Sequence, residues 1–223
     1  ASSPRRRGSI GGKPIDSRFR GNDESVLKCG SLMGFLPFES QIFRPLFGDD
    51  ELEAIFSDQA TIRQWVKIEA ALAHVQGKLA VIPAEAAEKI VLAADHFQID
   101  WPQLQEGVDQ DGMPIANLVS QLRQFVGPGA APFVHWGATT QDIMDTAVVL
   151  QLLAGLEILE KRLLLIAQAL VTHSDTHRHT IMTGRTHAQH ALPITFGLKA
   201  AGWLSPLLRH LRRLPAIRQR LAQ

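Results

Sequence analysis

The stretch QDIMDTAVVLQLLAGLEILEKRLLLIAQALVTH, residues 141–173, decides the fold class of this chain. It predicts one helix of roughly 30 residues, which is about 50 Å long at a rise of about 1.5 Å per residue. Its apolar side chains spread around much of the helix circumference, which favours burial on several sides in a bundle or at a subunit interface. Gln151, Glu157 and Lys161 interrupt the stretch too often for a bilayer span, so we expect no membrane contact.

The segments before this stretch carry further helical patterns. Ser57 is placed to cap a helix whose apolar residues recur at helical spacing as far as Leu79. Other helices are predicted for residues 49–56, 83–94, from Asp100 onwards and for 115–126, where Gly127 then breaks the pattern. No stretch alternates convincingly with a period of two residues, so the fold class we predict is all-α.

A second long helix is predicted to start near Pro193 and to continue beyond Leu214, and Pro206 and Pro215 can bend it. The chain ends at Gln223 inside this pattern without a glycine cap, and we therefore expect it to be truncated. The expected organisation is a disordered basic arm at 1–40, an N-terminal helical domain at 41–134, and a partial central domain of long bundle helices at 135–223.

Composition restricts the partners. Lys and Arg number 23 against 22 Asp and Glu, a net charge of +1, which gives no field to attract nucleic acid or an acidic membrane. Cys29 is the single cysteine, so an internal disulfide is excluded and a reducing cytoplasm is expected. The arm lacks the apolar region of a secretory signal. Small molecules are the expected partners.

Two polar segments flank the long helix. In the first, VHWGATTQDIMDT at residues 134–146, Thr139, Thr140 and Gln141 offer donors at a helix N-terminus, where the dipole favours an anion such as a substrate carboxylate. Helix capping by Thr139 or Thr140, with Asp142 complementing the dipole, explains the same residues without any ligand. From the residues alone, both interpretations stay open.

The second polar segment is TGRTHAQHALP at residues 183–193, which we expect to be a loop. Thr186 and Gln189 lie beside His187 and can orient its ring for general acid or base chemistry. The alternative is a structural histidine. His173, His177 and His179 invite a metal site, but no carboxylate completes a ligand set, and a helix C-terminus explains them better.

Taken together, HWGATTQD at residues 135–142 and GRTHAQHALPITFG at 184–197 resemble the first two of the three signature regions of the fumarase/aspartase superfamily. The resemblance covers roughly residues 43–223. Three stretches, two of which extend the signatures, are most similar to the 3-carboxy-cis,cis-muconate cycloisomerases within that superfamily, and adenylosuccinate lyases come second. These stretches are VDQDGMPIANLVSQL at 108–122, HWGATTQDIMDTA at 135–147 and QHALPITFGLKAAGW at 189–203.

The resemblance implies roles for seven residues. It makes His187 and His135 catalytic, His187 through proton transfer as in adenylosuccinate lyases. The residues it implies for substrate binding are Thr139, Thr140, Gln141, Thr186 and Gln189. One departure is that a bulky apolar residue is expected in several muconate cycloisomerases where this chain has His187. A di- or tricarboxylate substrate is implied, with no cofactor and no metal.

The resemblance further implies a homotetramer in which His135 and His187 meet in one site only across subunits. The third signature, a loop whose serine acts as the base, is expected beyond Gln223, so the chain alone should be inactive. From another class, a non-catalytic helical interaction module remains the competing hypothesis, although two segments rich in pocket-type polar residues are unnecessary for a scaffold.

Overall fold

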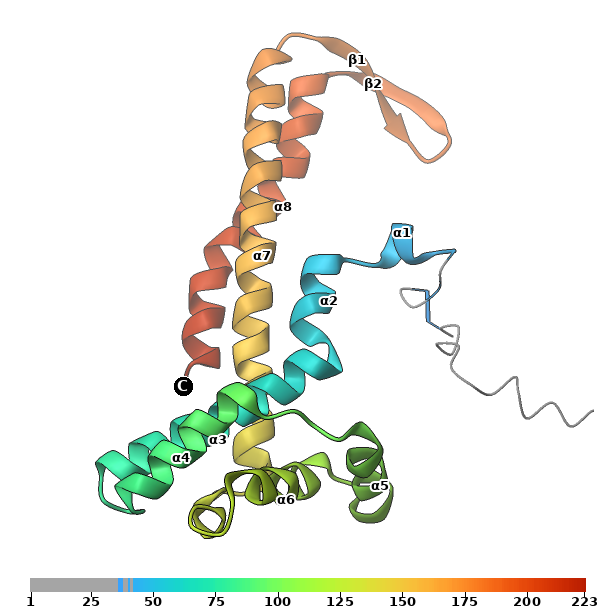
Figure 1. The fold of residues 1–223 in the computed structure, drawn as a ribbon. Helices are drawn as coiled ribbons and strands as arrows, with labels where there is room; N and C mark the ends of the chain where they lie inside the picture. The colour runs from blue at the N-terminus through green and yellow to red at the C-terminus, as the bar shows by residue number, and fades with distance from the viewer. Residues whose placement is uncertain (1–35, 38–39, 41) are drawn as a thin grey trace, which may run out of the picture. The chain divides into compact units, whose positions relative to one another are not determined.

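The computed structural model describes residues 36–37, 40 and 42–223 (Figure 1). The predicted disordered arm lies almost entirely outside these residues, and so does Cys29. The chain divides into two compact units, residues 1–48 and residues 49–223. In the first unit, α1 (Arg44–Phe47) is a single helical turn. The second unit carries both polar segments of the sequence.

The second unit is mostly helical, as predicted. Local chemistry sets several helix starts: the side chains of Asp49, Ser57 and Asp100 each accept a hydrogen bond from a backbone N–H in the first turn of the helix that follows. Pro83 precedes the fourth helix. The helices in this region are α2 (Asp50–Phe56), α3 (Asp58–Lys78), α4 (Ala84–His96), α5 (Trp101–Asp111), α6 (Pro114–Val126) and the short 3-10 helix η2 (Ala131–Phe133).

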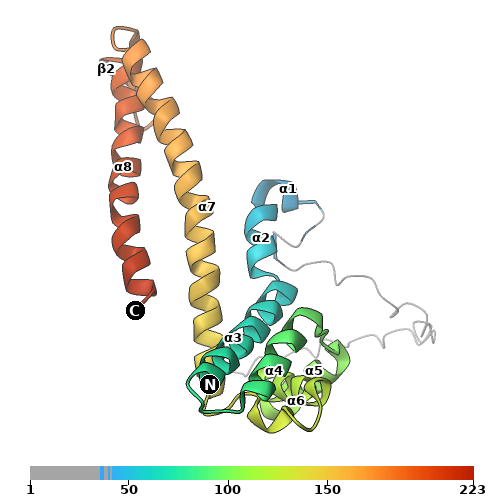
Figure 2. The same ribbon diagram turned by 60° about the vertical axis from the view of Figure 1, so that its left-hand side comes forward.

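Two long antiparallel helices make up the rest of the unit. They are α7 (Thr140–Thr176) and α8 (Phe196–Leu221), which lie side by side (Figures 1 and 2). With 37 residues, α7 exceeds the predicted length and spans about 55 Å. Pro206 and Pro215 both lie inside α8, which continues through them.

The connection between α7 and α8 differs from the predicted loop. It is an antiparallel hairpin of β1 (Ile181–Thr186) and β2 (Gln189–Thr195), a small sheet in a chain that is otherwise helical as predicted, and α8 starts at Phe196, three residues after the predicted start near Pro193. Most hairpin residues are exposed on both faces, so the sequence has no apolar alternation to reveal the strands. The pairing is irregular at Gly184, where an added Cβ would lie 2.6 Å from the carbonyl oxygen of Leu192.

The hydrophobic core sits at the N-terminal end of α7. Side chains from α3, α4, α5, α6 and the first turn of α7 form it, and Leu118, Leu122 and Ile143 are almost completely buried. Because α7 packs on both α3 and α6, helices on the two sides of the predicted 134/135 domain boundary share one unit. The division at that boundary stays a prediction.

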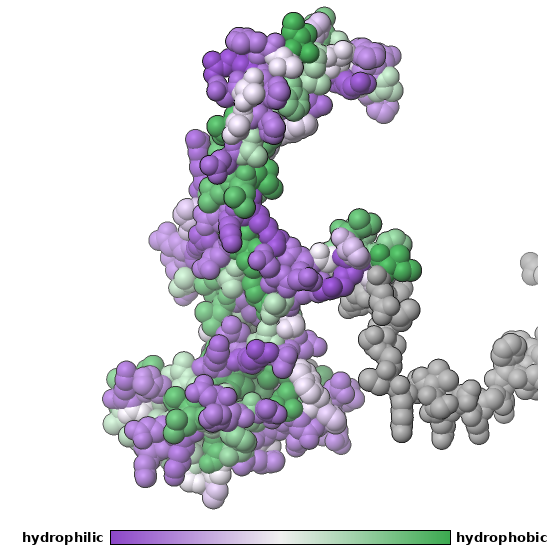
Figure 3. Space-filling model, turned by 45° about the horizontal axis from the view of Figure 1, so that its top comes forward, coloured by the Kyte–Doolittle hydropathy of each residue, from purple (hydrophilic) through white to green (hydrophobic). Residues whose placement is uncertain are grey.

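Far from this core, many apolar residues of α7 and α8 reach the surface. Leu165 is 60% exposed, Leu198 is 61% exposed and Trp203 is 51% exposed. Figure 3 shows hydrophobic areas between hydrophilic ones along this part. None of the helices in the described residues is long and apolar enough to cross a membrane.

Candidate functional site

The first polar segment turns sharply before it enters α7. His135 has φ of 62° and Gly137 has φ of 71°, both in the left-handed region that only glycine adopts freely. Asp142 then accepts a hydrogen bond from the backbone N–H of Thr139 at 2.8 Å and forms a capping box with it. The capping interpretation is therefore confirmed for Thr139 and Asp142, while substrate binding by this helix start stays a prediction.

His135 is held by an acid that lies far away in the sequence. Its Nδ1 is 2.6 Å from Oε1 of Glu69 on α3, whose side chain has no exposed surface, whereas the imidazole is 16% exposed. Burial raises the pKa of the Glu69 carboxyl. The hydrogen bond with His135 and the positive charge of Arg123 act in the opposite direction.

The residues on either side of His135 are also fixed by side chains of the helical domain. Arg123 on α6 donates a hydrogen bond from Nη2 to the carbonyl oxygen of Val134 at 3.1 Å. Gln76 on α3 donates from Nε2 to the carbonyl oxygen of Trp136 at 2.7 Å. Three consecutive residues therefore each receive a polar contact from α3 or α6, and we call residues 134–142 with these contacts the anchored segment.

The other predicted binding residues of the anchored segment lie in the first turn of α7. Thr140 is half-buried and Gln141 is exposed. The Gln141 amide donates from Nε2 to Oδ1 of Asp145 at 3.1 Å, one turn further along the helix. This helix start has the partial positive charge that suits a carboxylate.

The second polar segment lies in the hairpin. Thr186 and Gln189 face each other across its last pair, and His187 and Ala188 form the two-residue turn. All four residues are exposed. Within the described part of the chain, no side-chain hydrogen bond joins His187 to Thr186 or Gln189, so the expected orientation of the ring stays a prediction.

The two predicted catalytic histidines are not brought together within this chain. His135 precedes the N-terminal end of α7, and His187 follows its C-terminal end, so the whole helix lies between them (Figure 1). His135 shares its surroundings with Thr139, Thr140 and Gln141, while His187 shares the hairpin with Thr186 and Gln189.

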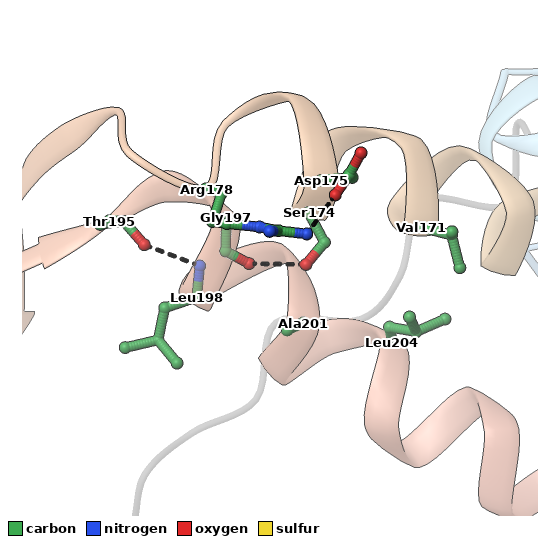
Figure 4. A pocket seen from close by; sticks show the side chains of 9 residues that line it. All are labelled: Val171, Ser174, Asp175, Arg178, Thr195, Gly197, Leu198, Ala201 and Leu204. Carbon is green, nitrogen blue, oxygen red and sulfur yellow. Dashed lines mark hydrogen bonds and ion pairs between the residues drawn. The ribbon is translucent and has the colours of Figure 1, made fainter.

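A cavity of about 420 Å³ lies where α7 ends and α8 begins (Figure 4). Ser174 donates a hydrogen bond to the carbonyl oxygen of Gly197 at 3.2 Å, and Arg178 pairs with Asp175 at 2.5 Å. None of the seven predicted site residues lines this cavity. Arg178 and Asp175 in its lining have side chains that are 69% and 72% exposed, so the cavity is open to solvent.

The histidines considered for a metal site have another arrangement. The rings of His173 and His177 stack at 5.9 Å, and both meet the ring of Phe196 edge-on. Within the residues that the structure describes, no group of three or more His, Cys, Asp or Glu side chains could hold a metal ion.

Sequence reasoning missed Glu69, Gln76 and Arg123. For Glu69 a signal was present, because it occupies an apolar stripe of α3 in which Ile62, Val66 and Ala73 are buried. An acid at a core position is rarely left unpaired. For Gln76 and Arg123 the sequence carried no signal, because each contacts a backbone carbonyl that no side-chain pattern identifies.

The fold and these two segments define a helical protein of the lyase type. Residues 47–223 match the model of the family described as Lyase, and the chain belongs to this family, within the fumarase/aspartase superfamily. The superfamily expected from the two signatures is thereby confirmed.

The relatives that this chain is similar to act on different substrates. It is 38% identical to trans-aconitate decarboxylase 1 of Mycosarcoma maydis over 79% of this chain and 36% of the relative. It is 39% identical to the 3-carboxy-cis,cis-muconate cycloisomerase of Acinetobacter baylyi over 82% of this chain and 42% of the relative. Adenylosuccinate lyase of Methanocaldococcus jannaschii is 31% identical over 88% of this chain and 41% of the relative.

The solved structures that this chain is similar to also include a lyase and a lactonizing enzyme. A fumarate lyase from Mesorhizobium sp. BNC1 superposes with a TM-score of 0.73 at 46% identity, covering 78% of this chain and 41% of that chain. The 3-carboxy-cis,cis-muconate lactonizing enzyme from Pseudomonas putida superposes with a TM-score of 0.77 at 36% identity, covering 82% and 42%. The chain spans about two fifths of the length of the relatives it matches.

Proposed function

We propose that this chain is part of a 3-carboxy-cis,cis-muconate cycloisomerase, which closes a tricarboxylate to a lactone. The observation that carries the proposal is the anchored segment, in which His135 is fixed beside a helix start with donors for a carboxylate. The sequence stretches shared with muconate cycloisomerases, and the relatives of that name, support the choice of substrate.

The chemistry requires fixed donors at one carboxylate. A carboxylate oxygen of the substrate adds to a carbon of a double bond and closes the ring, and the neighbouring carbon gains a proton. Negative charge develops on the carboxylate next to that carbon before the proton arrives. Thr139, Thr140 and Gln141 are the proposed donors that stabilise this charge, and His135 and His187 are the proposed groups for proton movement.

We also propose that the active protein is a cytoplasmic homotetramer with sites shared between subunits. Two observations support shared sites. His135 and His187 lie at opposite ends of α7, and the apolar residues of α7 and α8 that reach the surface suit a bundle with other helices. A copy packed antiparallel along α7 would bring the hairpin of one chain to the anchored segment of another.

Adenylosuccinate cleavage is the second candidate, because His187 stands where adenylosuccinate lyases carry a proton-transferring histidine and a relative with that activity matches the chain. That reaction removes a proton from a carbon beside a carboxylate and breaks a C–N bond to release fumarate. It would use the same donors, so only the substrate distinguishes the two reactions.

The experiment is to assay the purified chain, alone and joined to a C-terminal segment that carries the expected third signature. Loss of absorbance of 3-carboxymuconate is measured beside cleavage of adenylosuccinate. Turnover of 3-carboxymuconate in the joined protein is the expected result. Turnover of adenylosuccinate alone would replace the first candidate with the second, and comparable turnover by the unjoined chain would contradict the expectation that the chain alone is inactive.

A further inference from the structure

The acid that holds His135 is costly to the fold. Glu69 occupies a core position of α3 between Val66 and Ala73, and its side chain has no exposed surface. Within the described residues, its Oε2 is buried without a hydrogen-bond partner. Burying an acid with one oxygen unpaired costs free energy that an apolar residue at this position would not cost.

The contacts of Glu69 converge on one residue. Its Oε1 lies 2.6 Å from Nδ1 of His135, its one side-chain hydrogen-bond partner among the described residues. The partner is 66 residues away in the sequence, so the contact joins α3 to the turn before α7. The ring of His135 is thereby fixed in a turn whose backbone is already in the left-handed region.

Two proton arrangements are compatible with this contact. Either the imidazole N–H at Nδ1 donates to a carboxylate, or a protonated carboxyl donates to a bare Nδ1. Burial of the Glu69 side chain favours the neutral carboxyl, whereas the contact with His135 and the positive charge of Arg123 favour the carboxylate. The 2.6 Å contact between Oε1 and Nδ1 is as short as a hydrogen bond with a charged partner, and a carboxylate that accepts the imidazole N–H supplies that charge.

We propose that Glu69 is a positioning residue: its carboxylate accepts the Nδ1–H of His135, which fixes the ring and leaves Nε2 as the nitrogen that exchanges a proton with substrate. The inference rests on the catalytic use of His135 proposed above. Within the described part of the chain, Nε2 has no hydrogen-bond partner. A buried acid that sets the tautomer and orientation of a histidine is a recurring device in enzymes.

The direct test observes the tautomer and needs no substrate. The chain is labelled with 15N-histidine, and two-bond 1H–15N correlation spectra distinguish a protonated Nδ1 from a protonated Nε2. His135→Asn identifies the signals by their loss. A protonated Nδ1 with a bare Nε2 in the neutral ring is the expected result. A neutral ring with a protonated Nε2 and a bare Nδ1 would overturn the proposal.

Three variants separate positioning from simple support of the turn. Glu69→Met keeps the length of the side chain but removes the acceptor, and the Nδ1–H form should be lost. Glu69→Gln keeps an acceptor oxygen, so the Nδ1–H form should be retained. Gln76→Met is the matched control, because it removes a neighbouring contact of α3 with the same turn and leaves the ring untouched. An unchanged tautomer in Glu69→Met would overturn the proposal.

Kinetics of the joined protein give the second measurement. We expect Glu69→Met to lower kcat about 10²-fold or more with little change in KM, and Glu69→Gln to recover much of that loss. An equal loss in both variants, with Nδ1–H retained in Glu69→Gln, would overturn the positioning role. If the joined protein without substitutions has no turnover on either substrate, the proposed function fails. The spectra of the chain still decide the tautomer of His135.

Discussion

The anchored segment and the hairpin carry the two family signatures, yet their surroundings differ completely. Three side chains of the helical domain hold residues 134–136, and the capping box ties residue 139 to α7. The turn of the hairpin has exposed side chains and only backbone pairing. One half of the proposed site is therefore preorganised by its own chain, whereas the other depends on what packs against it.

The largest expected difference concerns the core beneath the anchored segment. Leu118 is 0% exposed, and Leu118→Ala should lower the free energy of unfolding by about 2–5 kcal/mol because it leaves a cavity. Leu192 in the hairpin is 83% exposed, and Leu192→Ala should change the free energy of unfolding by less than about 0.5 kcal/mol. Urea unfolding of the chain measures both. Similar losses would show that the hairpin is part of the cooperative core.

Glycine substitutions test the same contrast at the backbone. Gly137 has φ of 71° and free space around it, so Gly137→Ala should cost about 1–2 kcal/mol through backbone strain alone. Gly184→Ala would place a Cβ 2.6 Å from the carbonyl oxygen of Leu192, so the hairpin pairing must shift. Amide hydrogen exchange should show faster exchange in the hairpin of Gly184→Ala, with the urea midpoint unchanged. A shift of that midpoint would contradict the independence of the hairpin.

The capping box gives an effect of intermediate size. Asp142→Ala removes the acceptor for the Thr139 N–H and the favourable charge at the helix start, and should cost about 1 kcal/mol. Asp145→Ala is the control one turn along, where the acid contacts only an exposed amide, and should cost less than about 0.5 kcal/mol. Thermal unfolding ranks the pair. The reverse order would contradict the role given to Asp142.

The smallest effect concerns the attachment of α2 to α7. Arg162 donates to Asp49, and this hydrogen bond, followed by one from the Leu52 backbone, lowers the pKa of Asp49 from 3.8 to about 2. A lowered folded-state pKa means that the stabilisation is present above about pH 4 and is lost as the pH falls through about 2. Asp49→Asn should flatten the fall of the unfolding temperature between about pH 6 and about pH 2.

The control for this pH measurement is Asp175→Asn, since Asp175 forms an exposed pair with Arg178 within one turn. This variant should keep the wild-type pH dependence, because exposed pairs of this kind contribute little. A wild-type profile in Asp49→Asn would show that the contact with Arg162 does not stabilise the folded chain.

The features predicted from the sequence are those decided locally. Ser57, Asp100 and Thr139 act within three or four residues of their own helix starts, and a pattern of that length can be read directly. The anchored residues Thr139, Thr140 and Gln141 were located for the same reason. The hairpin escaped prediction because strands exposed on both faces leave no alternation.

The partner of His135 could not be predicted because the sequence does not record which distant residues meet. Glu69 is recognisable as an acid in an apolar stripe, but its partner depends on how α3 packs against the turn before α7. The separation of His135 and His187, in contrast, could be predicted from the sequence. Once one helix was predicted to join the two segments, its length alone placed them far apart.

The length of α7 has a mechanical consequence. The helix is about 55 Å long, its N-terminal end is fixed in the hydrophobic core, and α8 packs along its side. A tilt of about 5° at the N-terminal end would therefore move the hairpin by about 5 Å. Catalytic geometry tolerates far less than this displacement. In the proposed site, the position of the hairpin therefore depends on the packing of α8 along α7, and a substitution that loosens this packing should displace the hairpin more than any part of α7.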